Sequence, residues 1–188
     1  TPMARNHIEL ISGGLAIVLE GGIAADARLL STVPVGSFAG LALTLMPWLL
    51  SGGTLHLHHG FEPLTFGAQR DATDFEVMTL PAAALPAMAP AGLLGGEACT
   101  LVALWRAPEQ VMSSASWSAQ QATLTDIYLF GEAGLFGARR IADDGSPALI
   151  RQGPHGAPRE LPGSSISGEI LLTPRGTLGL RGPMVPVA

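Results

Sequence analysis

The sequence predicts an α/β fold: a mainly parallel sheet flanked by helices, followed by a small antiparallel β segment. Helix-type and strand-type apolar spacings alternate strictly from residue 6 to about residue 130, which is the pattern of a parallel sheet covered on both faces. Beyond Gly134 the helical spacing disappears, and short strands alternate with glycine- and proline-rich turns. We therefore expect an α/β subdomain over residues 1–134 and a β-rich segment over residues 135–188.

The helices are predicted from apolar spacing and from their end signals. From Asn6 or His7 to Leu19, apolar residues recur every three or four positions, and Gly21-Gly22 then ends the helix. A strongly apolar helix ends in the same way at Gly52-Gly53. The predicted helices are 6–19, 38–50, 61–72, an alanine-rich stretch with Pro81 near its first turn, where proline is tolerated, and 108–112.

The strands are predicted from short apolar runs between turn signals. Within the alternating region they are 28–33, 54–58, 75–80, 100–105 and 126–130. Beyond that region they are 135–141, 146–151, 168–173 and 176–181, with residues 151–167 as a connecting loop. The later group is typical of a small antiparallel sheet or a fragment of a barrel.

The composition excludes several classes of protein. Apolar residues make up 47% of the chain, which is ample for a folded core and excludes intrinsic disorder. Charged residues reach only 13%, against about 25% in ordinary soluble domains. With 24 Gly and 15 Pro, the chain is not a coiled coil. The low charge indicates surfaces that a partner or a further part of the protein covers.

The charged residues narrow the chemistry. All ten basic residues are Arg, and the net charge is -5, so no basic patch is available for double-stranded nucleic acid. The lack of Lys excludes Schiff-base chemistry and a P-loop lysine within these residues. Cys99 is the single cysteine, which excludes an internal disulfide framework and fits a reducing, cytoplasmic compartment.

No segment is expected to span a membrane. The most apolar stretch, residues 38–50, has thirteen residues where about 20 are needed, and we interpret it as a buried helix. The first residues lack the basic-then-apolar order of a signal peptide and contain no initiator Met at position 1, so the start resembles a cut within a longer chain.

Three further groups of residues could carry chemistry, but each has a simpler structural interpretation. His56 and His58 share one face of a predicted strand and could bind a metal, but no carboxylate or Cys sits at ligand spacing, and a solvated strand end is the alternative. Asp143-Asp144-Gly145 reads as an acidic turn. The glycine pairs lack the three-glycine spacing of a dinucleotide-binding loop.

The most specific arrangement is Tyr128-Leu129-Phe130-Gly131-Glu132-Ala133-Gly134. It lies at the end of the last predicted parallel strand, where open α/β sheets bind ligands. The carboxylate of Glu132 there suits a magnesium ion held against a nucleotide phosphate. A Glu that is merely solvated at a strand end is the alternative reading.

A series of segments in chain order resembles the motifs of the adenylate-forming superfamily, which includes acyl- and aryl-CoA synthetases, luciferases and peptide-synthetase adenylation domains. Residues 128–134 resemble its Tyr-Gly-x-Thr-Glu-x-Gly motif, and Phe61-Glu62-Pro63 resembles its Phe-Asp-Pro. The other similar segments are Asn6-His7, Val33 to Leu41, Gly52-Gly53-Thr54, Leu80-Pro81, Gly168-Glu169-Ile170 and Arg181 to Val185. The resemblance covers nearly the whole chain.

The resemblance implies a set of ligands and site residues. ATP or AMP and Mg²⁺ would be the cofactors and CoA the thiol acceptor, with a carboxylic acid as substrate. Glu132 would bind the metal, Tyr128 would stack near the adenine and Gly131 would lie near the α-phosphate. The remaining implied residues are Ala107 and Pro108 in the turn that walls the adenine, and Ser37, Phe38 and Ala39 beside the acyl pocket.

The sequence departs from the family pattern at several of these positions. Gly131 replaces the Thr before the Glu, and Leu129 replaces the Gly after the Tyr. Trp105 and Arg106 stand where glycines let the purine approach, and Ser37 stands at a substrate-gate His. The family's phosphate loop would precede Thr1, while its ribose-binding Asp and catalytic Lys would follow Ala188. We therefore interpret the chain as a central fragment of a large AMP-binding domain, its β-rich part beginning a barrel-like subdomain and its remainder serving as a partner.

Two functions of different class follow from these observations. The first is an AMP-forming ligase that activates a carboxylic acid as an acyl-adenylate and transfers it to a thiol; this fragment alone would be inactive. The second is a degenerate, non-catalytic module with the same fold that binds an acyl group or a protein. The lost Thr and the bulky residues at the adenine wall favour the second reading.

Overall fold

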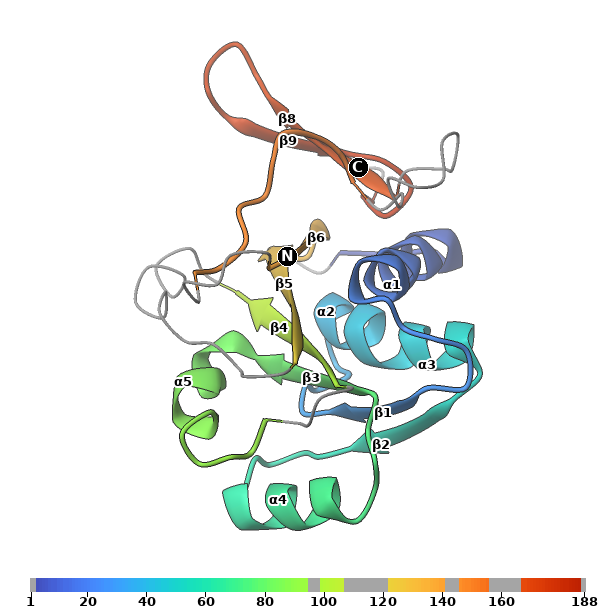
Figure 1. The fold of residues 1–188 in the computed structure, drawn as a ribbon. Coiled ribbons are helices and arrows are strands. Elements are labelled where there is room, and N and C mark those ends of the chain that lie inside the picture. Colours follow the sequence, from blue (N-terminus) through green and yellow to red (C-terminus); the bar gives the residue numbers. More distant parts are fainter. Residues whose placement is uncertain (1–2, 95–98, 107–121, 141–145, 156–166, 187–188) are drawn as a thin grey trace.

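A computed structural model describes residues 3–94, 99–106, 122–140, 146–155 and 167–186, and its centre is a six-stranded sheet in the order β2-β1-β3-β4-β5-β6 (Figure 1). Strands β1 to β5 pair in parallel, and β6 runs antiparallel to β5. The mainly parallel sheet expected for the first part of the chain is therefore confirmed. The strands are β1 Arg28–Ser31, β2 Thr54–Leu57, β3 Val77–Pro81, β4 Thr100–Trp105, β5 Thr123–Phe130 and β6 Gly134–Arg139.

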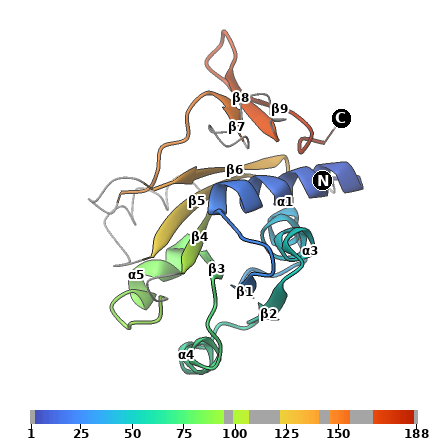
Figure 2. The same cartoon turned by 45° about the vertical axis from the view of Figure 1, so that its right-hand side comes forward.

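Helices cover both faces of this sheet, because successive strand residues point to opposite sides. Leu29, Val77 and Val102 pack on the face covered by α1 (His7–Gly21) and by the helical residues 38–51. Their neighbours Leu30 and Met78 pack on the face covered by α4 (Pro63–Asp71) and α5 (Leu85–Met88). Figure 2 shows these two layers, with α1 running alongside β6. The domain thus has two apolar cores, one on each face.

The first helix begins and ends at the residues that the pattern indicates. Asn6 caps α1 by accepting a hydrogen bond from the Glu9 N–H at 3.0 Å, and the Glu9 carboxylate accepts from the Asn6 N–H at 3.2 Å. This reciprocal capping box satisfies two backbone donors that a helix start leaves without intrahelical partners. At the other end, Gly22 adopts φ 60°, a left-handed conformation that suits glycine and stops the helix.

The second predicted helix is continuous but not uniform. It comprises α2 (Phe38–Gly40), a π-helical turn (Leu41–Leu45) and α3 (Met46–Ser51). Pro47 lacks an N–H group, and in a regular helix its ring would clash with the carbonyl of Leu43. The wider π turn immediately before it, in which the Met46 N–H donates to the Leu41 carbonyl, accommodates the proline without ending the helix.

Of the remaining predicted helices that lie in the described residues, α4 follows the prediction and the alanine-rich helix differs from it. Glu62 caps α4 through hydrogen bonds from the N–H groups of Leu64 and Thr65. Pro81 ends β3 rather than lying in a helix, and a short 3₁₀ turn (Ala82–Ala84) separates it from α5. The predicted helix 108–112 lies outside the described residues. Among the helices that the structure describes, none is both long and apolar enough to cross a membrane.

The β-rich segment forms a separate three-stranded antiparallel sheet in the order β7-β8-β9, as expected, but two of its elements differ from the prediction. The strand expected at 135–141 is β6, which joins the main sheet. The strand expected at 146–151 is not formed, because the N–H and carbonyl of Ala148 are bonded to the side chains of Asp126 and Tyr128 instead of to a neighbouring strand.

The three strands of the second sheet are β7 Gly153–His155, β8 Gly168–Leu172 and β9 Leu178–Arg181. β7 lies in the stretch expected to be a loop. A small apolar cluster of Ala16, Phe136, Ile170 and Met184 joins this sheet to α1 and β6. The division of the chain into subdomains at residue 134 stays a prediction.

Candidate functional site

The tight turn between β5 and β6 positions the central candidate residue. The turn is closed by a hydrogen bond of 3.0 Å from the Ala133 N–H to the Phe130 carbonyl. Gly131 adopts φ 57° within it, a conformation that costs little only for residues without a Cβ. The Glu132 side chain is exposed at this turn, which lies beyond the carboxyl end of β5. Ligands bind at this edge of open α/β sheets.

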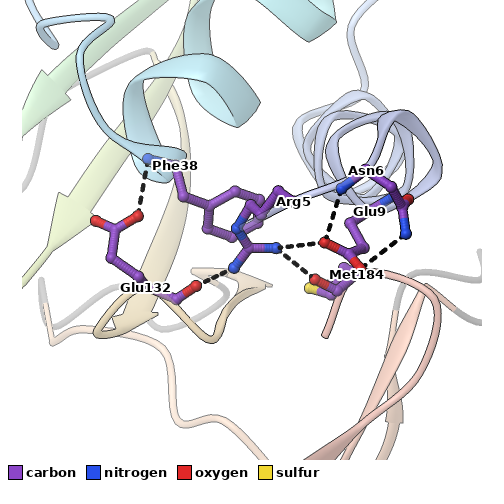
Figure 3. Close-up of polar contacts among 6 residues, drawn as sticks. All are labelled: Arg5, Asn6, Glu9, Phe38, Glu132 and Met184. Carbon is purple, nitrogen blue, oxygen red and sulfur yellow. Dashed lines mark hydrogen bonds and ion pairs between the residues drawn. The ribbon is translucent and has the colours of Figure 1, made fainter. Parts of the chain in front are cut away.

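Two predicted site segments meet at this turn. The carboxylate oxygen Oε2 of Glu132 accepts a hydrogen bond of 3.1 Å from the Phe38 N–H (Figure 3). The Ser37 hydroxyl accepts a second one from the Gly40 N–H at 3.2 Å, so Ser37 is the N-cap of α2. A carboxylate is favourable beside a helix start, where backbone N–H groups point outward. The structure therefore brings the predicted metal ligand next to the predicted acyl-pocket residues.

The acyl-pocket residues differ in their exposure. The side chains of Phe38 and Ala39 are buried, at 2% and 0% exposure, and both belong to the apolar core between the sheet and α1. Ser37 is half-buried. These residues therefore form a wall with a packed interior behind it, and Ser37 marks the side that is open to solvent.

Sequence reasoning missed Arg5, which lies at the centre of this arrangement. Its guanidinium donates hydrogen bonds to the carbonyl oxygens of Glu132 and Met184, the latter at 2.7 Å. The same group lies over the ring of Phe38, with 3.3 Å between Cζ and the ring centroid. Burial lowers the pKa of Arg5 from its ordinary value, and the carboxylates of Glu9 and Glu132 oppose that shift. Arginine nevertheless stays charged in proteins.

Tyr128 lies on β5 in register with Trp105 on β4, and the two rings stack at 6.4 Å between centroids. Its hydroxyl donates a hydrogen bond of 2.6 Å to the carbonyl of Ala148. Burial raises the pKa of Tyr128, the Asp126 carboxylate raises it further, and Arg140 opposes both. The phenol is therefore neutral and acts as a hydrogen-bond donor at physiological pH.

Asp126 is a second residue that sequence reasoning did not single out. Its carboxylate is completely buried and pairs with the Arg140 guanidinium, with 2.7 Å between Oδ1 and Nη2. It also accepts hydrogen bonds from the Trp105 indole at 2.8 Å and from the Ala148 N–H at 2.7 Å. An Asp inside the apolar strand Leu-Thr-Asp-Ile was the available signal, because a buried carboxylate needs a cationic partner.

Trp105 is buried beneath the predicted adenine residue Tyr128 and is not exposed at the candidate site. Its side chain is 1% exposed and packs in the core beneath α5. The bulky residue that the resemblance placed at the start of the adenine wall is thus accommodated in the interior. Ala107 and Pro108, the other predicted residues of that wall, lie outside the described residues.

The histidine segment has a structural role in the described part of the chain. The Nε2 atom of His58 accepts a hydrogen bond from the Glu62 N–H at 3.2 Å, so Nδ1 carries the proton and donates to the Gln69 amide oxygen at 3.1 Å. The two ring nitrogens are therefore engaged with both ends of α4, one with its N-cap residue Glu62 and one with Gln69 in its last turn. His56 packs edge-on against Phe75.

The residues at the turn fit a magnesium ion that is shared with a nucleotide. Within the described ranges, no group of three or more His, Cys, Asp or Glu side chains is close enough to hold a metal by itself. Mg²⁺ usually takes one or two carboxylates and completes its shell with phosphate oxygens and water. Glu132 supplies one such carboxylate, and Figure 3 shows its second oxygen turned away from Phe38.

The described residues have the fold of adenylate-forming CoA synthetases, which confirms the resemblance at the level of the fold. O-succinylbenzoate CoA synthetase (MenE) from Bacillus subtilis, in complex with AMP, superposes with a TM-score of 0.70 at 16% identity, over 98% of this chain and 38% of that one. The same enzyme with ATP and magnesium gives a TM-score of 0.67 at 16% identity, over 99% and 39%. ATP-bound MatB from Rhodopseudomonas palustris gives 0.64 at 15% identity, over 96% and 36%.

Two curated sequence relatives, feruloyl-CoA synthases from Amycolatopsis and Streptomyces, are similar over a shorter range. Each is 38% identical over 74 residues, which are 39% of this chain and 14% of that protein. No family model matches the sequence. The chain therefore spans about a third to two fifths of the solved structures named above, at 36–39% of their lengths.

Proposed function

We propose that the protein is an AMP-forming ligase that activates a carboxylic acid and passes the acyl group to a thiol, with CoA as the acceptor. One observation carries the proposal. The structure places an exposed carboxylate, Glu132, at the carboxyl edge of a parallel sheet and in hydrogen-bond contact with the Ser37–Ala39 segment. The fold shared with AMP- and ATP-bound CoA synthetases supports the assignment.

The reaction proceeds by two displacements. A carboxylate oxygen of the acid attacks the α-phosphorus of ATP, and pyrophosphate leaves with the electron pair of the broken P–O bond. The thiolate then attacks the acyl carbon, and AMP leaves. Little covalent work falls to the protein, whose task is to hold the reactants in line and to stabilise developing charge.

Each residue has a separate part in this proposal. Glu132 would hold the magnesium ion, which when bound would neutralise phosphate charge. Gly131 offers its backbone beside the α-phosphate. Tyr128, fixed by its bond to Ala148, presents its ring near the adenine. Ser37 faces the acyl group, backed by the buried Phe38 and Ala39.

A non-catalytic module is the second candidate, and a specific observation favours it. The family motif that this segment resembles has a Thr at the position of Gly131, and glycine cannot supply the hydroxyl of that Thr. Such a module would keep the fold and the acyl wall and would bind an acyl group or a protein partner without turnover.

ATP–pyrophosphate exchange across a panel of carboxylic acids separates the two candidates. We expect the full-length protein to catalyse exchange, and we expect Glu132→Gln to lower the rate by about 10²–10³, the cost of removing one preorganised electrostatic group. Glu76→Gln is the matched control, because Glu76 precedes β3 at the opposite edge of the sheet and is paired with Arg28.

The outcomes discriminate clearly. Equal, measurable exchange in the wild type and in Glu132→Gln would exclude the magnesium role of Glu132. No exchange with any acid, together with saturable binding of an acyl compound, would establish the non-catalytic module.

A further inference from the structure

We infer that Arg5 is a positioning residue, which holds the β5–β6 turn so that the Glu132 carboxylate stays against the start of α2. The part of this inference that concerns magnesium rests on the proposed function. The part that concerns the position of the carboxylate rests only on the contacts in Figure 3.

The contacts form a closed ring of three residues. Arg5 donates to the main-chain carbonyl of Glu132, the side chain of Glu132 accepts from the Phe38 N–H, and the Phe38 ring lies beneath the Arg5 guanidinium. Each member therefore restrains the other two. Because Arg5 binds the main chain of Glu132, the carboxylate keeps its second oxygen for a ligand.

Two further contacts fix Arg5 itself. One guanidinium nitrogen donates to the Met184 carbonyl at 2.7 Å and lies 3.9 Å from the Glu9 carboxylate. The same Glu9 carboxylate completes the capping box of α1. Arg5 is thus attached both to the start of the first helix and to the segment that follows β9, so the turn is held from a rigid base.

The burial of Arg5 is costly, which argues that its position has a use. The side chain is only 8% exposed, and its Nε is the one buried side-chain nitrogen or oxygen without a hydrogen-bond partner among the described residues. A buried donor without a partner costs free energy. Groups of this kind in native structures call for an explanation such as a functional constraint.

Arginine is the residue type that this geometry requires. Its planar fork can donate to two carbonyls in one plane while its face lies on an aromatic ring. Lysine keeps the charge but offers a single ammonium, and methionine keeps the length and the apolar contact with Phe38 but donates nothing. The two replacements therefore separate charge and packing from the forked hydrogen bonds.

The functional consequence concerns distance. With Arg5 in place, the proposed metal ligand and the acyl wall move as one unit, because the Glu132 carboxylate stays within 3.1 Å of the Phe38 nitrogen. Without it, the exposed turn can carry the carboxylate away from the wall. Part of the binding free energy of the metal would then be spent on the entropy lost when the Glu132 carboxylate is ordered.

Amide hydrogen exchange of the full-length protein tests the position of the carboxylate. We expect the Phe38 amide to exchange about ten- to a hundredfold faster in Arg5→Met, as for loss of a bond to a charged acceptor, and by an intermediate factor in Arg5→Lys. Glu132→Ala sets the full effect. The Gly40 amide, bonded to Ser37 in the same helix start, is the internal control and should be unchanged.

Magnesium titration of pyrophosphate exchange tests the positioning role. In Arg5→Met we expect the half-saturating Mg²⁺ concentration to rise about ten- to a hundredfold, as when a group that orients a metal ligand is removed. The rate at saturating Mg²⁺ should be nearly unchanged, because the carboxylate is still present. A merely structural role would alter the unfolding midpoint without this split.

The results distinguish a failure of the inference from a failure of the proposed function. An unchanged amide hydrogen exchange rate at Phe38 in Arg5→Met, or equal acceleration at the Phe38 and Gly40 amides, would overturn the inference. Faster amide exchange at Phe38 with an unaltered Mg²⁺ requirement would overturn the positioning role. Faster amide exchange at Phe38 in a protein that does not catalyse ATP–pyrophosphate exchange would support the contact and refute the ligase.

Discussion

Among the residues that support the candidate site from the interior, Asp126 should be the one whose replacement destabilises the fold most. The carboxylate is completely buried, and each oxygen accepts two hydrogen bonds. Oδ1 accepts from the Trp105 indole at 2.8 Å and from Arg140 at 2.7 Å, while Oδ2 accepts from Arg140 at 3.0 Å and from the Ala148 N–H at 2.7 Å. Asp126→Ala removes all four of these hydrogen bonds, two of which come from the Arg140 guanidinium, itself only 3% exposed.

The expected loss is about 3–5 kcal/mol of unfolding free energy, the usual cost of removing one partner of a buried ion pair. Asp126→Asn should not rescue it. Whichever way the amide is turned, its NH₂ group faces two N–H donors, because both carboxylate oxygens accept two each. The double variant Asp126→Leu with Arg140→Met should recover only part of the loss, because it replaces the ion pair with apolar groups but still leaves the Trp105 indole and the Ala148 N–H without their acceptor.

Urea unfolding followed by far-UV circular dichroism measures these differences, with the slope m as a check that the unfolded state is unchanged. A second readout follows the backbone, because the Ala148 N–H donates to Asp126 and the Ala148 carbonyl accepts from Tyr128. Amide exchange at Ala148 should accelerate in Asp126→Asn. An Asp126→Asn protein within about 0.5 kcal/mol of the wild type, the range of neutral surface changes, would refute the reasoning.

Three further predictions concern other parts of the chain. Gly131→Thr should lower the unfolding free energy by about 1–2 kcal/mol, because Gly131 has φ 57°, even though an added Cβ would meet open space. Gly131→Asn should lower it less, because Asn tolerates this conformation. Equal losses in the two variants, measured by urea unfolding, would contradict this prediction. Burial raises the pKa of Cys99 to about 12, so iodoacetamide at pH 8 should label the thiol only in urea, and stoichiometric labelling of the folded protein would disprove it. The Arg28 side chain lowers the pKa of Glu76, so this pair stabilises the fold above the unfolded-state pKa of about 4.3; the difference in melting temperature between wild type and Glu76→Gln should shrink below that pH, and a constant difference would contradict the pairing.

Apolar spacing and end signals predicted those helices and strands whose boundaries depend on neighbouring residues in the sequence. The apolar run Thr100–Trp105 is β4 with the predicted bounds, and the first helix begins after Asn6 as expected. The pattern could not show how the helix passes Pro47, since the π turn is a response to one residue within an otherwise continuous apolar face. It also placed a strand at 146–151, where Asp126 and Tyr128 take the backbone groups of Ala148.

The motif and its place at a strand end singled out Glu132, and the family resemblance singled out Ser37 and Phe38 beside an acyl pocket. Neither predicted that the Glu132 carboxylate would accept a hydrogen bond from the Phe38 N–H. Arg5 was missed because its partners lie 127 and 179 residues away, and no local spacing encodes such contacts. The adenine side of the site stays a prediction, as do the individual roles of the site residues.

The long reach of Arg5 also bears on the order in which the molecule assembles. The core strands β1 and β3 pair across 48 residues (Leu29 with Val77) and β3 and β4 across 23 (Val77 with Thr100), whereas Arg5 must close loops of 127 and 179 residues. Closing such loops costs chain entropy before the contact is made, and long-range contacts slow folding. We therefore expect the sheet to form first and the Arg5–Glu132–Phe38 ring last. In native-state fluctuations the same ring should open before the sheet does, leaving a folded protein with its candidate site transiently dismantled.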